Sequence, residues 1–412
     1  MDVSFGTGAY ENNMKLIRVY SEPGSGTNQI GTYEAMSGKQ THVSFRTDAR
    51  VPAPQSTDHF FIVGALAAFL QGESYTHQGL VSEGLIESFR QSMETWSNWW
   101  DYRPIEITAQ TGSAPNKCLK GKRSGCLMSG GVDSLFSAIQ LRDEIDVFVN
   151  ILHCKSEQPN SLLNRPHDDL ADLAQSMDKT LLRIETNVMS AFPAIEDVWS
   201  SVSHGPCLAA VGHFLSSELS GMRISASFAH DQLQPWGSHP TTDKNFSSGG
   251  FRFEHSGAAY NRLEKHRVIA DHPELLRYLS VCEQGPQTGA KINCGKCQKC
   301  LRSMITLDLL DVNVRDAPTF DWDDYDPQDL KKFLLQGHVN CSELLAFAEE
   351  IERDDIAEIL RDVIAYADRY RWIVQLELYA RRRFNWLVRF KPLLKRLRVA
   401  VYALMNIRPR RL

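Results

Sequence analysis

The sequence predicts an α/β protein whose centre is a parallel sheet with helices on both faces. Three features of the 412-residue chain support this prediction: strands and helices alternate between residues 125 and 228, a glycine-rich loop joins the first strand to its helix, and a cysteine cluster follows. Such alternation is typical of parallel sheets, because parallel strands need a long crossover connection that is usually a helix. A chain of this length is expected to form two or three domains.

The alternating segment defines the expected sheet. Apolar runs predict strands over residues 125–128, 146–153, 180–186 and 222–228, and helical periodicity predicts helices over 133–142, 168–177 and 208–219. Ligands of such sheets bind beyond the carboxyl ends of the strands. We therefore expect the glycine-rich loop at residues 129–134 and the polar segment at residues 229–243 to lie at one edge.

Four regions are predicted along the chain. Residues 1–122 are expected to form an N-terminal α/β domain, with strands over 14–20, 42–46 and 103–108 and helices over 59–70 and 79–99. A polar linker at residues 111–124 leads into a central domain, residues 123–310. Residues 311–370 predict an acidic helical domain, with a helix that starts at Asp326-Pro327 and helices over 342–353 and 355–370. Residues 371–412 form a basic amphipathic tail.

The loop Ser129-Gly130-Gly131-Val132-Asp133-Ser134 carries the strongest functional signal. Glycine lets the backbone turn tightly and approach a ligand without a Cβ in the way. Serine hydroxyls and the N–H groups of the first helical turn then point at one place, where the helix dipole also favours an anion. A serine–glycine surface turn is the alternative, but the flanking strand and helix are the context that a phosphate-binding loop requires.

Four cysteines are spaced as metal ligands. Cys294, Cys297 and Cys300 stand three residues apart, and Cys282 precedes them. Four thiolates in a tetrahedral array are typical of structural zinc. An iron–sulfur cluster uses the same ligands, and unligated or redox-active thiols are further alternatives. The chain holds nine cysteines and opens without the apolar core of a secretion signal, which together predict a cytoplasmic location.

The loop and the cysteines together resemble a known family. Ser-Gly-Gly-Val-Asp-Ser is similar to the PP-loop of the ATP pyrophosphatase superfamily, and its combination with the cysteines resembles the 7-cyano-7-deazaguanine synthase family over residues 123–310. This resemblance implies a HUP-type parallel α/β/α sandwich with a four-cysteine zinc knob, here with an added N-terminal α/β domain and C-terminal helical extension, and it implies ATP, Mg²⁺ and Zn²⁺ as ligands. Residues 229–240 replace the family's Ser-Gly-Tyr-Pro-Asp-Cys substrate segment, so ATP chemistry is implied rather than the deazaguanine substrate. Residues 236–240 and 293–297 look more like an uncharacterised bacterial PP-loop group.

The resemblance also implies roles around ATP. The pyrophosphate would be held by five residues of the loop, Ser129, Gly130, Gly131, Asp133 and Ser134, with Asp133 also binding Mg²⁺. Backbone groups at Ile151 and His153, where the second central strand ends, would bind adenine. The helix dipole alone also favours a carboxylate at Asp133, and that role is compatible with metal binding.

A second group of polar residues is expected beside the nucleotide. Arg262 and Lys265 lie three apart on one helical face, where a cation would neutralise charge on the α-phosphate, and with Asp133 they are the predicted catalytic residues. A solvated helix face is the alternative. The substrate is expected to contact four residues of the polar segment, Asp231, Trp236, His239 and Asp243. Each of these also fits a plain loop role, and Trp236 either stacks on a planar substrate or fixes the loop.

Charge is unevenly distributed along the chain. Its 45 basic and 50 acidic residues give a net −5, yet eleven basic and no acidic residues follow position 380, so the rest carries about −16. A basic segment interleaved with aromatic residues binds an anionic membrane surface or RNA, or packs on the acidic body of its own chain. Of these three roles we expect the last. Lipid binding would instead place the protein peripherally at the inner membrane surface.

These features predict an enzyme. We expect an ATP-dependent, AMP-forming ligase or amidotransferase that adenylates a carboxylate or amide oxygen, releases pyrophosphate and transfers the activated group to ammonia or another amine. Its partners are then a small-molecule or peptide carboxylate and an amine donor. The alternatives are a PP-loop tRNA sulfurtransferase, in which the tail would bind RNA, and a non-catalytic ATP-binding module.

Overall fold

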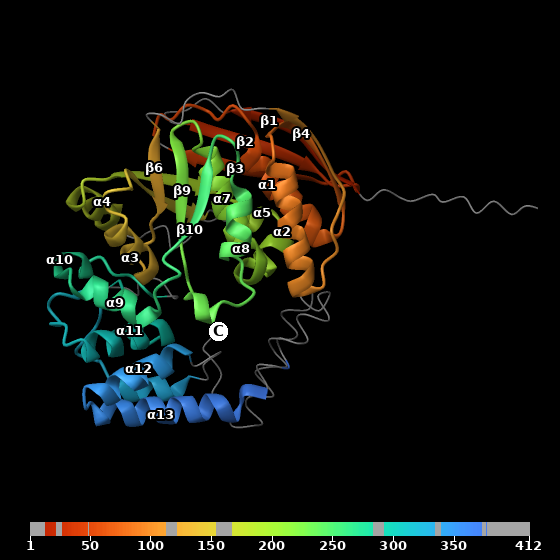
Figure 1. Ribbon diagram of the computed structural model, residues 1–412. Helices are drawn as coiled ribbons and strands as arrows, with labels where there is room; N and C mark the ends of the chain where they lie inside the picture. The colour runs from red at the N-terminus through yellow and green to blue at the C-terminus, as the bar shows by residue number, and fades with distance from the viewer. Residues whose placement is uncertain are drawn as a thin grey trace, which may run out of the picture.

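A computed structural model describes residues 13–21, 27–47, 49–112, 122–153, 167–282, 292–333, 339–372 and 376. The described strands form one mostly parallel sheet, which lies across the upper part of Figure 1. Their order across the sheet is β10 (Arg252–Ser256), β9 (Leu219–Ser225), β6 (Arg123–Leu127), β7 (Val147–His153), β8 (Thr180–Thr186), β3 (Gln40–Thr47), β2 (Thr27–Glu34), β1 (Asn13–Ser21), β4 (Ser74–Ser82) and β5 (Ile107–Gly112).

The half of the sheet formed by β6 to β10 is parallel throughout, which confirms the predicted parallel sheet. In the centre, Gly125 of β6 pairs with Val147 of β7, and Leu127 pairs with Val149. Parallel neighbours end at the same edge of a sheet. The carboxyl ends of β6 and β7 therefore lie side by side.

The N-terminal strands continue the same sheet. β1, β2 and β3 form an antiparallel meander, while β4 pairs in parallel with β1 and β5 pairs in parallel with β4. β3 then joins the central half through antiparallel pairing of Phe45 with Thr186 and of Arg46 with Glu185. Asn187 reinforces this junction, because its Oδ1 accepts the Ser44 N–H at 2.8 Å. The sheet thus runs across the predicted boundary at residue 122, which lies between β5 and β6.

Helices cover both faces of the parallel half. One face packs against α7 (His204–Phe214), and the other against α3 (Val132–Gln140) and α4 (His167–Ser176), with α9 (Arg262–Ala270) packed on α3. On the side of α7, α1 (Asp58–Gln71) and α2 (Leu85–Trp100) cover the N-terminal strands, because α1 contacts β1 and β4 and α2 contacts β4. The side chains of β7 alternate accordingly: Val147 and Val149 lie in the first core and Phe148 in the second. The short helices are α5 (Val188–Ala191), α6 (Pro193–Asp197), α8 (Pro240–Asp243) and α10 (Pro273–Leu276).

A third core joins the C-terminal helices to the central region. α11 (Gln298–Leu309), α12 (Val339–Glu350) and α13 (Asp354–Arg369) pack with α9, and their shared core includes Leu263, Leu301, Leu344 and Leu360. These helices lie below one end of the sheet in Figure 1, with α13 lowest. The predicted helix start at Asp326-Pro327 is confirmed as a short 3-10 helix over Pro327–Lys332, whose N-cap Asp326 accepts the Gln328 N–H. The helical extension therefore buries its apolar residues against α9 and α11.

Several predicted elements differ at their ends. The helix predicted over 79–99 is wrong at its start, because Ser74–Ser82 form β4 and the chain turns at Gly84, where φ is +83°, before α2 begins. The strand predicted over 103–108 begins only at Ile107. The helix predicted over 208–219 runs over His204–Phe214 instead, and Leu219 begins β9. Strands β2 and β10 were not predicted. For β10 the reason is its place at an edge of the sheet, where polar residues are tolerated and an apolar run is not required.

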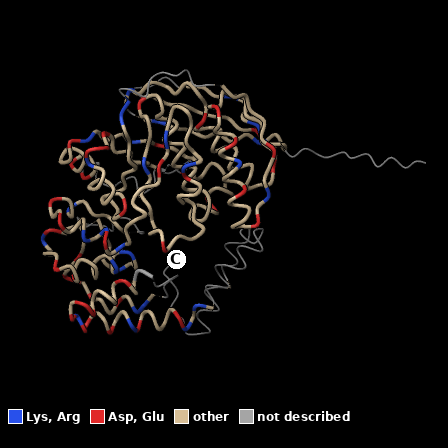
Figure 2. The backbone as a smooth tube through the Cα atoms, in the orientation of Figure 1, with Lys and Arg blue, Asp and Glu red and all other residues tan. Residues whose placement is uncertain are grey.

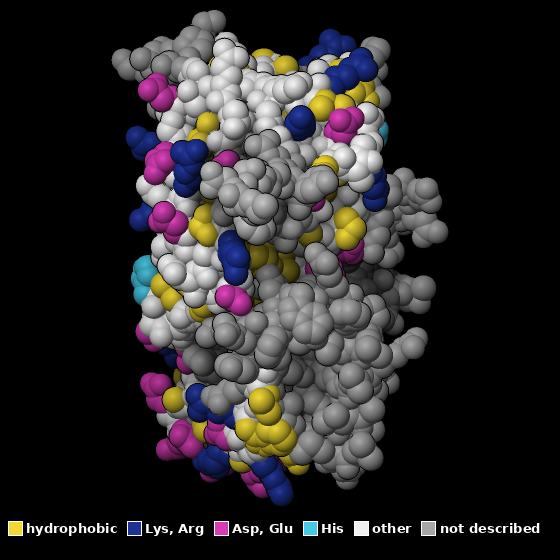
Figure 3. All heavy atoms as spheres, turned by 90° about the vertical axis from the view of Figure 1, so that its right-hand side faces the viewer, with side chains coloured by type: hydrophobic (Ala, Val, Ile, Leu, Met, Phe, Trp, Pro, Cys, Tyr) yellow, Lys and Arg dark blue, Asp and Glu magenta, His cyan; other side chains and the backbone are white. Residues whose placement is uncertain are grey.

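Charges of both signs are interspersed on the described surface. Figure 2 shows mostly acidic residues with a few basic ones along α13, and Figure 3 shows residues of both signs, with small apolar groups, over one side of the molecule. None of the helices in the described part of the chain combines the length and apolar character needed to cross a bilayer. The basic tail lies outside the described residues, except for residues 371, 372 and 376.

Candidate functional site

The glycine loop (residues 129–134) is a tight turn held by its own serines. Gly130 has φ +74°, a conformation that strongly favours glycine. The Gly131 N–H donates to Ser129 Oγ at 3.3 Å, and Ser134 Oγ donates to the Gly131 carbonyl at 3.0 Å. The two serine hydroxyls lie 3.2 Å apart. Ser129 and Ser134 thus meet at the start of α3, where the first N–H groups of a helix have no intrahelical partner.

Two neighbouring segments fix the position of the loop. Asn150 of β7 donates from Nδ2 to the Met128 carbonyl at 2.8 Å. On the other side, the Ser280 N–H donates to the Gly130 carbonyl at 2.7 Å. The loop is therefore attached both to the carboxyl edge of the sheet and to the segment that leads into the cysteines.

Asp133 forms ion pairs with both predicted cations. Its Oδ1 lies 3.0 Å from Lys265 Nζ, and its Oδ2 lies 3.1 Å from Arg262 Nη2. The Lys265 side chain is 2% exposed and also donates to the Ala226 carbonyl at 2.6 Å. A capping box starts α9 here, because Asn261 Oδ1 accepts the Glu264 N–H and Glu264 accepts the Asn261 N–H. The structure thus brings together all three residues that were predicted to be catalytic.

The ionic partners shift each other's pKa. Burial raises the pKa of the Asp133 carboxyl, but Arg262 and Lys265 outweigh burial and hold this pKa below its ordinary value. Burial lowers the pKa of the Lys265 ammonium below its ordinary value, although Asp133 opposes that change. Asp133 is therefore a carboxylate at neutral pH, and it keeps lone pairs for a further ligand because a carboxylate has about four acceptor sites.

His266 lies next to these cations as a neutral side chain. Burial lowers the pKa of His266 to about 4. Its Nδ1 therefore donates to the Arg262 carbonyl at 2.8 Å, which leaves Nε2 to accept from Ser303 Oγ at 3.4 Å. This contact joins α9 to α11.

The four cysteines converge as predicted. The sulfur atoms of Cys282, Cys294, Cys297 and Cys300 all lie within 4.8 Å of one another. Cys300 Sγ is 3.4 Å from Cys297 Sγ and 3.9 Å from Cys294 Sγ. Tetrahedral Zn–S bonds of about 2.3 Å place sulfurs about 3.8 Å apart. This thiol cluster therefore has the ligands and the size to hold a metal ion such as zinc.

Backbone and side-chain contacts hold the thiol cluster in shape. Gly295 has φ +65° within the turn, and Cys297 Sγ accepts the Cys300 N–H at 3.5 Å as the N-cap of α11. Asn293 Oδ1 accepts the Val281 N–H at 2.8 Å and the Cys282 N–H at 3.2 Å. Asn293 thereby connects the segment of Cys282 to the turn that holds the other three cysteines.

The glycine loop and the thiol cluster border one pocket of about 340 Å³. This loop pocket is lined by Ser129, Gly131 and Asp133 from the loop region and by Arg262 and His266 from α9. Cys282 and Ser280 line it on the side of the cysteines. Pockets of this size are typical of small-molecule sites.

Sequence reasoning missed one wall of the loop pocket. Four residues of α11 line it: Lys299, Arg302, Ser303 and Thr306. Their spacing of i, i+3, i+4 and i+7 places them on one helical face. These polar residues follow Cys297 at helical spacing in the sequence. Helical periodicity could therefore have predicted this polar face, but the segment was interpreted only through the spacing of its cysteines.

The residues predicted to bind adenine lie at the carboxyl edge of the sheet. Ile151 pairs with Ile184, and His153 pairs with Thr186 at the end of β7. Because β7 is adjacent to β6, this end lies on the same edge of the sheet as the glycine loop. Ile151 is half-buried, and the side chain of His153 lies outside the described residues.

The four residues predicted to bind substrate do not line the loop pocket. Asp231 is exposed, whereas Asp243 is fully buried and its Oδ2 accepts from Ser238 Oγ at 2.6 Å. The same Oδ2 lies 2.7 Å from His255 Nδ1. His239 caps α8 by accepting the Thr241 N–H, and Trp236 packs edge-on against Phe228. Asp243 and His239 therefore stabilise the polar segment at residues 229–243 through hydrogen bonds within the fold.

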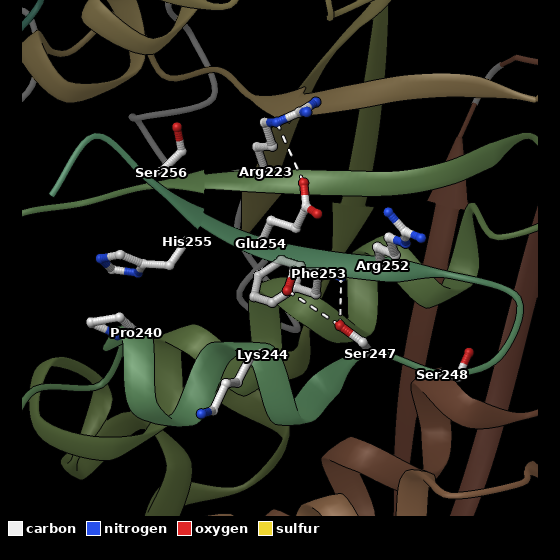
Figure 4. Close-up of a pocket in the computed structure, with 10 residues that line it drawn as sticks. All are labelled: Arg223, Pro240, Lys244, Ser247, Ser248, Arg252, Phe253, Glu254, His255 and Ser256. Atoms are coloured by element: carbon white, nitrogen blue, oxygen red, sulfur yellow. Dashed lines mark hydrogen bonds and ion pairs between the residues drawn. The ribbon is translucent and has the colours of Figure 1, made fainter. Parts of the chain in front are cut away.

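A second, open hollow of about 670 Å³ runs along the edge strand β10 (Figure 4). In Figure 4, Arg223 lies above the strand with Glu254, their Nε and Oε2 atoms 3.5 Å apart, while Lys244 lies below it. Ser247 Oγ accepts the Phe253 N–H at 3.0 Å. Arg223 and Glu254 thus pair with each other on one side of the strand while Lys244 lies on the other side, and the glycine loop does not border this hollow.

Comparisons of the chain with protein-family models, with curated proteins and with solved structures found no match. Any functional conclusion therefore depends on the geometry of the loop pocket and its residues.

Proposed function

We propose that the protein is an ATP-dependent, AMP-forming ligase or amidotransferase with a PP-loop in a HUP-type sandwich. The observation that carries this proposal is the convergence of the glycine loop, Asp133 and Arg262 on one pocket, with Lys265 buried behind Asp133 and paired with it. A loop of small residues at a helix N-terminus suits a pyrophosphate group. Cations beside that loop suit the charge that builds on a phosphorus atom under attack.

The proposed reaction has two steps. An acceptor oxygen attacks the α-phosphorus of ATP, a new P–O bond forms, and the bond to the bridging oxygen breaks so that pyrophosphate leaves. An amine then attacks the activated carbon, AMP leaves with the acceptor oxygen, and the amine nitrogen loses a proton. Arg262 and Lys265 would stabilise the first transition state by electrostatics, and the glycine loop would orient the leaving pyrophosphate.

Two metals fit residues of the chain under this proposal. The Asp133 carboxylate retains acceptor sites beside its two ion pairs and would hold Mg²⁺ against the phosphates. The thiol cluster would hold one Zn²⁺ ion. Sulfurs within 4.8 Å of one another enclose a single metal atom, which favours zinc over an iron–sulfur cluster, whose ligands surround several irons. The zinc would then order the start of α11.

The cysteines in the described part of the chain favour the ligase over a sulfurtransferase. A sulfur carrier needs an accessible thiolate. Among the described cysteines outside the thiol cluster, burial raises the pKa of Cys126 to about 12 and that of Cys341 to about 11, and Cys207 is also fully buried. These thiols stay protonated and shielded.

The products of ATP cleavage test the proposal. The full-length protein is incubated with Mg-ATP, ammonium and a panel of carboxylates, and ³¹P NMR follows the phosphorus species. We expect AMP and pyrophosphate in equal amounts with at least one acceptor. Formation of ADP and phosphate would contradict the proposal, and ATP binding without any cleavage would favour a non-catalytic ATP-binding module.

A further inference from the structure

The wall of the loop pocket formed by α11 is rigid and polar. On one side of α11, Leu301, Ile305 and Leu309 pack in the third core, which α11 shares with α12 and α13. On another side, Met304 and Leu307 pack in the second core, which contains residues of α3 and α4. The remaining side carries the α11 stripe, which consists of Lys299, Arg302, Ser303 and Thr306. A helix held on two sides presents its third side in a fixed position.

Within the stripe, the hydroxyls brace the helix and the cations add charge to the pocket. Thr306 Oγ1 donates to the Arg302 carbonyl at 2.7 Å, and Ser303 Oγ contacts His266. Asp133 is the single carboxylate among the described residues of the lining, and it is already paired with Arg262 and Lys265. With Lys299 and Arg302, the lining therefore carries more positive than negative charge.

The same wall is bordered by apolar side chains. Leu263 of α9 and Leu344 of α12 both line the loop pocket. Adenine is expected at the end of β7, so these apolar side chains suit a different ligand, and an organic acid presents both a charged end and an apolar body. Arginine binds carboxylates through two parallel hydrogen bonds.

We propose that the α11 stripe binds the carboxylate of the acceptor, with Lys299 and Arg302 on its oxygens and Leu263 and Leu344 against its apolar part. This inference rests on the proposed function, in which the glycine loop holds the pyrophosphate of ATP. It narrows the acceptor from a carboxylate or amide to a carboxylate that carries an apolar group. It also gives the helical extension a part in substrate binding, because Leu344 belongs to α12.

Calorimetry with matched probes tests the inference. The full-length protein, already saturated with Mg²⁺ and α,β-methylene-ATP, is titrated with hexanoate and with hexanamide, which has the same tail without the charge. We expect hexanoate to bind at least tenfold more tightly than hexanamide. Arg302→Gln and Lys299→Gln should each remove this preference and change the affinity for the nucleotide by less than about threefold. Arg361→Gln, on the exposed side of α13, should behave as wild type.

Three outcomes are distinguishable. Equal affinity of the wild type for hexanoate and hexanamide overturns the inference, and so does a loss of nucleotide affinity in Arg302→Gln as large as the loss for hexanoate. Failure of the wild type to bind α,β-methylene-ATP at all overturns the proposed function instead. If Arg302→Gln does not fold, Lys299→Gln decides the result.

Discussion

At the residue scale, the site depends on contacts between residues that are far apart in the sequence. Asp133 and Lys265 are separated by 132 positions, yet their charged atoms lie 3.0 Å apart. Local patterns predicted each residue alone: Asp133 from its place in the glycine loop, and Arg262 and Lys265 from their shared helical face. Their ion pairs were not predictable, because the packing of α9 against α3 decides them.

Lys265→Met tests the electrostatic role of this group. The variant keeps most of the length of the side chain and leaves Asp133 paired with Arg262, so the fold should survive. Loss of one preorganised cation beside the reacting phosphorus should lower kcat for AMP formation by roughly 100-fold or more. Lys39→Met serves as the control, because Lys39 is exposed and distant from Lys265 in the sequence. If Lys265→Met is as active as this control, Lys265 has only a structural role.

The burial of His59 leads to a testable prediction about how stability depends on pH. It is fully buried among Phe45, Phe60 and Phe214, and neither ring nitrogen has a hydrogen-bond partner among the residues that the structure describes. Burial lowers the pKa of His59 to about 3. Unfolded histidine binds a proton below about pH 6.5, whereas folded His59 does not, so acid favours the unfolded chain.

Stability should therefore fall as pH drops from about 6.5 towards 4. At pH 5 the contribution of His59 alone is about 2 kcal/mol. His77 and His266, each with a pKa that burial lowers to about 4, add to the same trend. His59→Phe should make the dependence shallower, which urea unfolding at about pH 7.5 and pH 5 measures. An equal loss of unfolding free energy in the variant and the wild type would contradict this account.

At the element scale, α11 connects the metal ligands to the loop pocket. Cys297 caps this helix, and two residues later Lys299 lines the pocket. The sequence predicted the thiol cluster well, because three of its four cysteines stand three residues apart in one short segment. It did not predict the wall formed by α11, because which face of a helix borders a pocket depends on the two cores on either side. Likewise, Asp243 was expected in a substrate pocket, but Ser238 and His255 bind its carboxylate inside the fold.

Removal of one thiol tests the role of this element. Cys297→Ser should lose the one equivalent of zinc that we expect in the purified wild type, and its melting temperature should fall steeply. Structural zinc contributes on the order of 10 kcal/mol, comparable to the stability of a whole domain. Cys207→Ala removes a buried thiol outside the cluster and should keep the zinc. Wild-type melting of a zinc-free Cys297→Ser protein would rule out a structural metal.

At the scale of the whole molecule, one sheet unites parts that the sequence predicted as separate. The junction consists of two residue pairs between β3 and β8. Pairing between strands so distant in the sequence leaves no local pattern, so the alternation of strands and helices predicted the parallel half but not its extension. The domain boundary at residue 122 and the placement of the basic tail stay predictions.

Deletion of residues 381–412 tests the predicted role of the tail. Loss of eleven cations from a chain whose remainder carries about −16 should lower the melting temperature if the tail packs on its own acidic body, and AMP formation should persist. Neither acidic vesicles nor tRNA should bind the full-length protein at physiological salt, where the screening length is about 8 Å. Flotation of the intact protein with acidic vesicles would contradict the intramolecular role, and binding of tRNA would contradict it equally.

The affinity for an ATP analogue tests the central claim, that the glycine loop holds the pyrophosphate of ATP. Isothermal titration of α,β-methylene-ATP with Mg²⁺ compares the wild type with the Ser129→Ala/Asp133→Ala variant. A control with the same two kinds of substitution, Ser37→Ala/Asp143→Ala, changes exposed positions outside the pocket. We predict at least 100-fold weaker binding in the loop variant, which should stay folded although loss of the Asp133–Lys265 ion pair lowers its melting temperature below that of the control. Unchanged affinity in a folded loop variant would contradict the account.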